Sequence, residues 1–251
     1  MARQQTVYVT GKMANLIFYN FRGRPAVRTM PKKIKQTRAT KDSAKLFGKA
    51  ARLSRVIREG LYPLYSDLGD ASIMPRLTGA VFQCLKDEEA TIGAEVFKDN
   101  LFFLRSFQWN RERELTEIMK KAVRPSFDEA GNLKLSLASL TPHKDLSVPA
   151  GTQTVILKIG ACSISWNDPD IYDHHSLEIN IPYNGGSRPA EEIVLPLKLK
   201  KNRLVLIGLA LRYSNGKQWR DINDKKKWMP VGVVKAVWTG NRQSSIVKRE
   251  T

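Results

Sequence analysis

The sequence predicts an α+β fold: an N-terminal basic β-hairpin and helical region over residues 1–130, followed by a C-terminal antiparallel β-sandwich over residues 131–251. Two β-rich runs at the N-terminus flank a glycine, which is a hairpin signal. Apolar residues then recur at helical spacing as far as about residue 125. From Leu133 the spacing changes to alternation, and about seven short β-rich runs follow, separated by Asn, Asp, Gly and Pro, as is typical of a sandwich.

The hairpin is expected over residues 5–31, where the runs LIFYNF and AVRTM flank Arg22-Gly23-Arg24. Upstream of these runs, Val7 and Val9 alternate with Tyr8 and Thr10, as in a β-strand. The turn places Arg22 and Arg24 next to each other at an exposed tip. A β-ribbon with such a tip can lie along phosphates or enter a groove, and the alternative is a turn that only aids solubility.

A basic linker over residues 31–40 leads into a helix that starts at Thr37 or Thr40 as N-cap. Gly60, with Pro63 close behind, predicts its end. At about 100° per residue, one side of this helix collects apolar side chains and the other collects cations. The expected apolar side consists of Leu46, Phe47, Ala50, Leu53, Ile57 and Leu61.

Positive charge is concentrated in the same part of the chain. Residues 1–60 contain 15 Lys and Arg against Asp42 and Glu59, which is +13 of the net +18. The net charge is −2 over residues 61–150 and +7 over residues 151–251. Local charge of this density predicts contact with nucleic acid or with an acidic protein surface, and the alternative is a solvated helix face. The residues predicted to contact nucleic acid are Arg22, Arg24, Arg28, Lys32, Lys33, Lys35, Arg38, Lys41, Lys45, Lys49, Arg52 and Arg55.

A second segment, GKQWRDINDKKKWMP, alternates aromatic residues with cations. It predicts a weaker secondary contact with nucleic acid, and the alternative is a charged loop with one Trp folded back. Trp166 and Trp238 lie in β-rich runs and are expected in the core. The residues of the secondary contact are Lys217, Trp219, Arg220, Lys225, Lys226, Lys227 and Trp228.

Two further helices are expected before the sandwich. The first follows Asp70, where Ile73, Leu77, Val81 and Leu85 recur every fourth residue. The second is expected over residues 109–123, with Glu117 and Lys121 as an i,i+4 ion pair. Turn-forming residues at 125–133 mark the predicted domain boundary.

No pattern in the sequence predicts an enzyme. There is no phosphate-binding glycine loop, no GxSxG and no HExxH, so no cofactor or catalytic residue is expected. Asp168, Asp170 and Asp173 lack the glycine and terminal glutamate of a calcium loop and predict a polar loop between strands. Cys84 and Cys162 lie in apolar runs and are expected to be buried thiols.

The expected location is the cytoplasm. The N-terminus lacks the apolar stretch of a secretory signal, and no run approaches the roughly 18 apolar residues of a membrane span.

Four motifs resemble a group of small basic proteins of Bacteroidetes. They are GKMANLIFY (GK-x-x-NL-x-FY), RTMP (R[ST]-x-P), QTRATK (QT-x-ATK) and FGKAARLSRVIR. The run LVLIGLALRYSNGKQWRDI is similar to the closing strands of that group. The resemblance implies a bacterial, non-secreted protein of two parts and implies no activity.

The sequence therefore predicts a non-enzymatic nucleic-acid-binding protein that grips phosphates through its basic hairpin, linker and helix, without choosing between DNA and RNA. The alternative is a structural subunit of a larger assembly, such as a phage-like particle or filament, whose basic segment docks on an acidic neighbour.

Overall fold

The computed structural model describes residues 9–31, 36–68, 71–86, 100–121, 123–128, 130–165, 168–198, 200–216 and 225–239. The chain divides into two compact units, residues 1–44 and residues 45–251. This division differs from the predicted one at residue 130. Residues 125–133 lie inside the second unit, where β4 (Val123–Phe127) and β5 (Asn132–Leu137) pair antiparallel across that turn.

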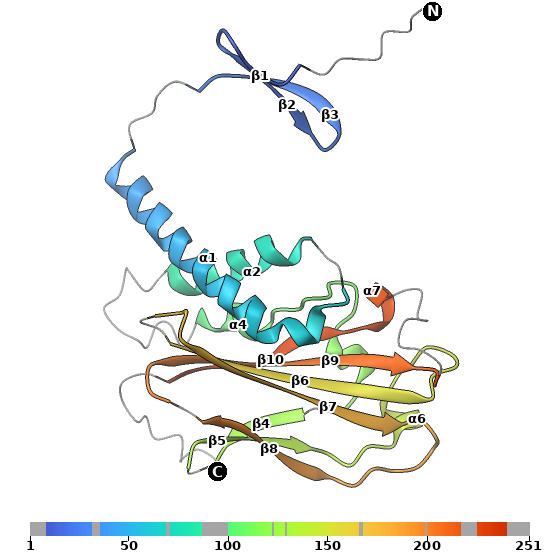
Figure 1. Cartoon of the computed structure of the whole chain (residues 1–251). Helices are drawn as coiled ribbons and strands as arrows, with labels where there is room; N and C mark the ends of the chain where they lie inside the picture. The colour runs from blue at the N-terminus through green and yellow to red at the C-terminus, as the bar shows by residue number, and fades with distance from the viewer. Residues whose placement is uncertain are drawn as a thin grey trace, which may run out of the picture. The chain divides into compact units, whose positions relative to one another are not determined.

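The first unit contains a three-stranded antiparallel sheet of β1 (Gly11–Met13), β2 (Leu16–Phe21) and β3 (Arg24–Thr29), in that order (Figure 1). The predicted hairpin is confirmed, because β2 and β3 pair from Leu16 with Thr29 to Phe21 with Arg24. The earlier strand is placed differently from the prediction. It begins at Gly11, whereas Val9 precedes it and Val7 lies outside the described residues.

Helix α1 (Arg38–Tyr65) is capped by the preceding Thr37, whose Oγ1 accepts a hydrogen bond from the backbone N–H of Thr40 at 3.2 Å. This is the geometry of an N-cap residue bonding the N3 amide. The predicted end at Gly60 is wrong, because α1 continues through Gly60 and Pro63 to Tyr65. Gly60 lies instead where the helix comes very close to Cys162 of the sheet beneath it.

The apolar side of α1 is largely as predicted, since five of its six expected residues are buried. The exception is Phe47, which is 55% exposed, with its ring 6.2 Å from that of Phe82. Phe47 lies about 90° around the helix from the middle of the buried stripe, at the edge of the contact with α2 (Ile73–Lys86). On the other edge of the buried side of α1, Val56 is also fully buried, although the sequence did not predict it there.

Helix α2 is confirmed, and Ile73, Leu77, Val81 and Leu85 are all buried. The helix predicted over residues 109–123 is wrong. After α4 (Phe102–Arg105), the backbone of Trp109 donates a hydrogen bond to the Val231 carbonyl at 2.8 Å and so follows a strand edge. Of the described residues in that range, only α5 (Leu115–Ile118) is helical.

The second unit has two antiparallel sheets. One is four-stranded, with order β10-β9-β6-β7, and the other is three-stranded, with order β4-β5-β8. The remaining strands are β6 (Thr154–Ser165), β7 (Tyr172–Pro182), β8 (Glu191–Lys198), β9 (Arg203–Ser214) and β10 (Val231–Thr239), and the remaining short helices are α6 (Pro142–Asp145) and α7 (Lys225–Trp228). The fold is therefore α+β with three antiparallel sheets in all among the described residues.

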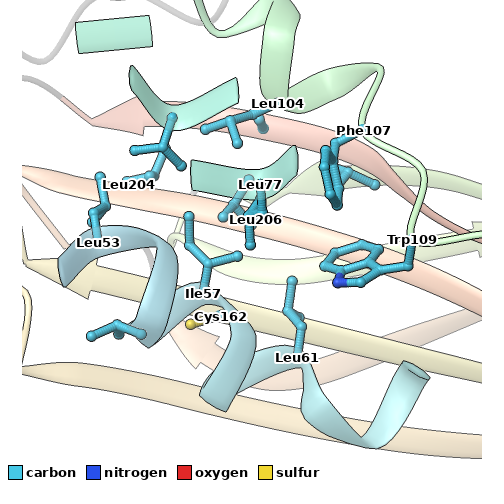
Figure 2. Close-up of a cluster of buried hydrophobic side chains, with 14 of the residues drawn as sticks. Leu53, Ile57, Leu61, Leu77, Leu104, Phe107, Trp109, Cys162, Leu204 and Leu206 are labelled. Atoms are coloured by element: carbon cyan, nitrogen blue, oxygen red, sulfur yellow. The ribbon is translucent and has the colours of Figure 1, made fainter. Parts of the chain in front are cut away.

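The four-stranded sheet is covered on both sides, with α1 and α2 on one side and the three-stranded sheet on the other (Figure 1). In β9, Leu204 and Leu206 join the core formed with the helices, as Figure 2 shows. Their neighbours Val205 and Ile207 join the core formed with the three-stranded sheet. Burial on both faces explains why the run LVLIGLAL is continuously apolar instead of alternating.

Both cysteines are buried free thiols, as predicted, and burial raises the pKa of each to about 12. Trp238 is also buried as predicted, whereas Trp166 lies outside the described residues. Within the described part of the chain, every helix is too short or too polar to cross a membrane.

Candidate nucleic-acid interface

The small sheet of the first unit has two chemically different faces. Directly opposed residues of an antiparallel pair share a face, and residues two apart on a strand do so as well. One face, called here the cationic face, therefore carries Lys12, Ile17, Tyr19, Phe21, Arg24, Ala26 and Arg28. The other, called the uncharged face, carries Gly11, Met13, Leu16, Phe18, Asn20, Pro25, Val27 and Thr29.

The turn of the hairpin holds Arg22 in an uncommon backbone conformation. Arg22 and Gly23 have φ angles of 54° and 80°, as a two-residue type I′ turn requires. Such turns favour Asn, Asp or Gly at both positions, and a side chain like that of arginine is strained there. The turn therefore keeps a cation at the tip at some cost in local stability.

Each exposed ring on the cationic face has a guanidinium group next to it. The Cζ atom of Arg28 lies 5.5 Å from the ring centre of Tyr19, and that of Arg22 lies 5.3 Å from the ring centre of Phe21. Tyr19 is 37% exposed and Phe21 is 57% exposed. Cations and accessible aromatic rings thus alternate over one small surface.

The cations of this sheet lack acidic neighbours. The first 41 residues of the sequence contain no Asp or Glu. Among the residues that the structure describes, no carboxylate forms an ion pair with Lys12, Arg22, Arg24 or Arg28, although Arg22 and Arg28 contact aromatic rings. The nearest acid in the sequence, Asp42, is 4.0 Å from Arg38. Within the described part of the chain, no acidic side chain therefore compensates the positive charge of the sheet.

Two predicted contact residues on α1, Arg52 and Arg55, form ion pairs inside the second unit. Both bind Asp170 in the loop between β6 and β7, Arg55 at 2.7 Å, and Arg52 also reaches Asp168 at 3.3 Å. The hydrogen bond from Arg52 lowers the pKa of the Asp170 carboxyl, and Arg55 adds to this effect. These two arginines have their charges balanced by the polar loop that the sequence predicts.

The remaining predicted cations differ in their surroundings. Arg38, Lys41 and Lys45 are exposed on α1, and Lys49 is half-buried. Lys32, Lys33 and Lys35 of the linker lie outside the described residues. The structure thus brings Arg24 and Arg28 onto one face, with Arg22 at its tip.

The predicted secondary contact lies mostly outside the described residues. This holds for Lys217, Trp219 and Arg220, and for the side chains of Lys225 and Lys226. The exposed Lys227 places its Nζ 5.7 Å from the ring centre of Trp228. Trp228 itself packs against the core between the two sheets of the second unit, which agrees with the alternative of a Trp folded back.

The described residues contain no cluster of three or more His, Cys, Asp or Glu side chains that could hold a metal ion. Asp168 and Asp170 lie in the predicted loop between strands, whereas Asp173 lies in β7, where Lys200 binds it at 2.8 Å. Salt bridges to α1 and to the β8–β9 connection account for these three acids.

Sequence reasoning missed Lys12, Tyr19 and Phe21 as members of the cationic face. The signal that could have identified them is the turn length. A two-residue turn at Arg22-Gly23 opposes Phe21 to Arg24 and so fixes which residues of β2 and β3 share a face.

Comparison with protein-family models gave no match, and neither the curated proteins nor the solved structures contain a significant match to this chain.

Proposed function

We propose that this protein is a non-enzymatic nucleic-acid-binding protein of the bacterial cytoplasm, which contacts the phosphate backbone through its N-terminal hairpin, basic linker and the start of α1. The observation that carries this proposal is the cationic face. Lys12, Arg24 and Arg28 share it, Arg22 extends it at the tip, and none of them has a carboxylate partner among the described residues.

Phosphate contacts of this kind give affinity that depends on salt and not on base sequence. Lys32, Lys33 and Lys35 add charge between the sheet and α1, and Lys41 and Lys45 add it along the helix. Arg52 and Arg55 contribute less, because they already form ion pairs with Asp168 and Asp170. The two sheets of the second unit, packed as a β-sandwich, serve as the scaffold.

The uncharged face supports a second candidate, a structural subunit of a larger assembly. Met13 is 61% exposed and Val27 is 53% exposed on that face. Apolar surface of this kind marks contacts between proteins when it is contiguous. In this alternative the cations dock on an acidic neighbour.

The test is a salt titration of binding to a labelled generic oligonucleotide by the full chain. Five to eight phosphate contacts on duplex DNA predict a log–log slope of roughly −4 to −7. Arg24→Glu with Arg28→Glu should weaken binding, whereas Lys198→Glu, a charge swap on the exposed end of β8, should not.

Binding that is absent at about 50 mM salt, or equal between about 50 and 200 mM, contradicts the proposal. Light scattering coupled to size-exclusion chromatography then separates the two candidates. A mass that falls after nuclease treatment supports nucleic-acid binding, and a large assembly that persists without nucleic acid supports the structural subunit.

A further inference from the structure

We infer that the cationic face is a binding site for single-stranded nucleic acid, in which unpaired bases stack on Tyr19 and Phe21. This inference rests on the proposed function and adds the form of nucleic acid and the residues that contact its bases.

The two rings have the spacing that a row of bases needs. Tyr19 and Phe21 are two residues apart on β2 and point to the same face, so their Cα atoms are about 6.8 Å apart. Neither ring belongs to a hydrophobic core, and both are exposed. Two rings in this arrangement can each take one of two bases along an extended strand, as exposed aromatic residues of other single-strand-binding sheets do.

The residues around the two rings are suited to binding the sugar-phosphate backbone of a nucleic-acid strand. Ala26, which has a small side chain, lies opposite Tyr19, and the guanidinium group of Arg28 on the same strand lies 5.5 Å from the Tyr19 ring centre. Arg24 lies opposite Phe21, and Lys12 and Arg28 lie on either side of Ile17. A cation therefore stands beside each position where a base would stack, where it meets the negative charge of the backbone.

Stacking on these rings distinguishes single strands from duplexes. Bases in a duplex are already stacked on each other, and their faces are closed to a protein ring. In a single strand the base faces are available, and stacking on aromatic side chains tolerates any base. The cations attract both forms, whereas the rings add affinity for the single strand only.

The experiment measures binding of the full chain to three labelled oligonucleotides of equal length: oligo-dT, oligo-U and a duplex DNA. The test variant carries Tyr19→Leu and Phe21→Leu, which keep apolar bulk on the strand and remove both rings. It should bind the single strands at least about 30-fold more weakly and the duplex within about twofold of the original protein. The matched control is Phe18→Leu, which removes the neighbouring ring on the uncharged face and should change neither affinity.

Photo-cross-linking of the unaltered protein to oligo-dT gives a second readout that needs no variant. Cross-linked peptides should contain Tyr19 or Phe21. The relative affinities for oligo-dT and oligo-U show whether the strand is DNA or RNA.

The outcomes separate the inference from the function on which it rests. No salt-dependent binding to any of the three oligonucleotides overturns the proposed function and the inference together. Salt-dependent binding that the double variant leaves unchanged overturns the inference alone and keeps the phosphate-binding function. An equal loss in Phe18→Leu shows that the sheet has been disturbed as a whole, which also overturns the assignment of the two rings as the site.

Discussion

Gly60 of α1 lies directly against Cys162 of β6. A Cβ atom placed on Gly60 would overlap the Sγ atom of Cys162 and lie 3.1 Å from its Cβ atom. Four residues further along the helix, Leu64 fills the space above Gly208 of β9, where a Cβ atom would lie 2.7 Å from the Leu64 Cδ1 atom. Glycines on both elements thus let the helix settle closely on the sheet.

Replacing Gly60 by Ala should therefore destabilise the protein. Alanine favours a helix interior over glycine by about 1 kcal/mol, but the added methyl group meets a short, fully buried side chain that has little room to move. Overpacking of this kind costs about 1–3 kcal/mol, so we expect a net loss in the free energy of unfolding, measured by urea denaturation.

Gly48→Ala is the matched control, because Gly48 also lies inside α1 and a Cβ atom there would meet nothing within 4 Å. It should stabilise the protein by about 0.5–1 kcal/mol. A stabilising effect of both substitutions would show that the helix does not rest on Cys162.

Arg22→Asn should make the hairpin more stable and its binding weaker. Asparagine tolerates the positive φ angle that strains Arg22, so the amides of β2 and β3 should exchange their hydrogens more slowly. Loss of one phosphate contact should reduce the salt slope on duplex DNA by about 0.9.

Ala14→Gly provides the comparison at the other turn of the sheet, where Ala14 has a φ angle of 52°. The substitution relieves backbone strain and removes no charge. It should therefore slow amide hydrogen exchange in the sheet and leave the affinity for nucleic acid unchanged. If Arg22→Asn binds nucleic acid as tightly as the original protein, the turn arginine is not a contact.

Acid should weaken the attachment of α1 to the β6–β7 loop. Arg52 and Arg55 hold the pKa of Asp170 below its ordinary value of 3.8, so the folded protein gains stability from the charged form. That gain is present above the ordinary pKa and is lost as the pH falls through the lowered pKa of the folded state.

The measurement is the urea midpoint at a series of pH values between about 2 and 6, a range that includes the ordinary pKa of an aspartate and extends below it. The midpoint of the original protein should fall below about pH 4, and that of Asp170→Asn should fall less over the same range. Identical pH profiles would mean that the ion pair contributes nothing to stability, as happens for many exposed pairs.

A fragment comparison tests how the chain divides. Residues 36–251 keep the N-cap Thr37, both helices and both large sheets, and should unfold cooperatively on heating. Residues 131–251 lack β4 and expose the face of β6 and β9 that α1 and α2 cover, so they should aggregate or remain unfolded. Cooperative melting of residues 131–251 would instead support the division predicted from the sequence.

Local patterns in the sequence were enough to predict the elements whose burial follows from periodicity. The buried apolar side of α1 and the buried residues at every fourth position of α2 are of this kind. The turn at Arg22-Gly23 was predicted from its local residue types. The predictions failed where a distant residue decides the outcome. Gly60 was expected to end α1 because its contact with Cys162 is not visible in the sequence, and residues 109–123 were expected to be helical because pairing with Val231 lies 122 positions away.

The candidate site followed the same rule. The net charge of the segment could be counted from the sequence. Which side chains share a face of the sheet depends on strand register, and the register places Tyr19 and Phe21 on the same face as Arg24 and Arg28. Register also needs the partner strand, so single residues such as Lys12 could not be assigned before β1 and β2 were paired. The neutralisation of Arg52 by Asp170 depends on a loop more than a hundred residues downstream.

The close contact of Leu64 with Gly208 has a consequence for the order in which the protein can be made. The ribosome synthesises Gly208 of β9 about 140 residues after Leu64, which takes roughly 7 to 30 seconds at about 5–20 residues per second. Until then the nascent helix lacks part of the sheet that covers its apolar stripe. Because residues 1–60 carry a net charge of +13, we expect neighbouring nascent chains to repel one another over this interval, which would limit their association.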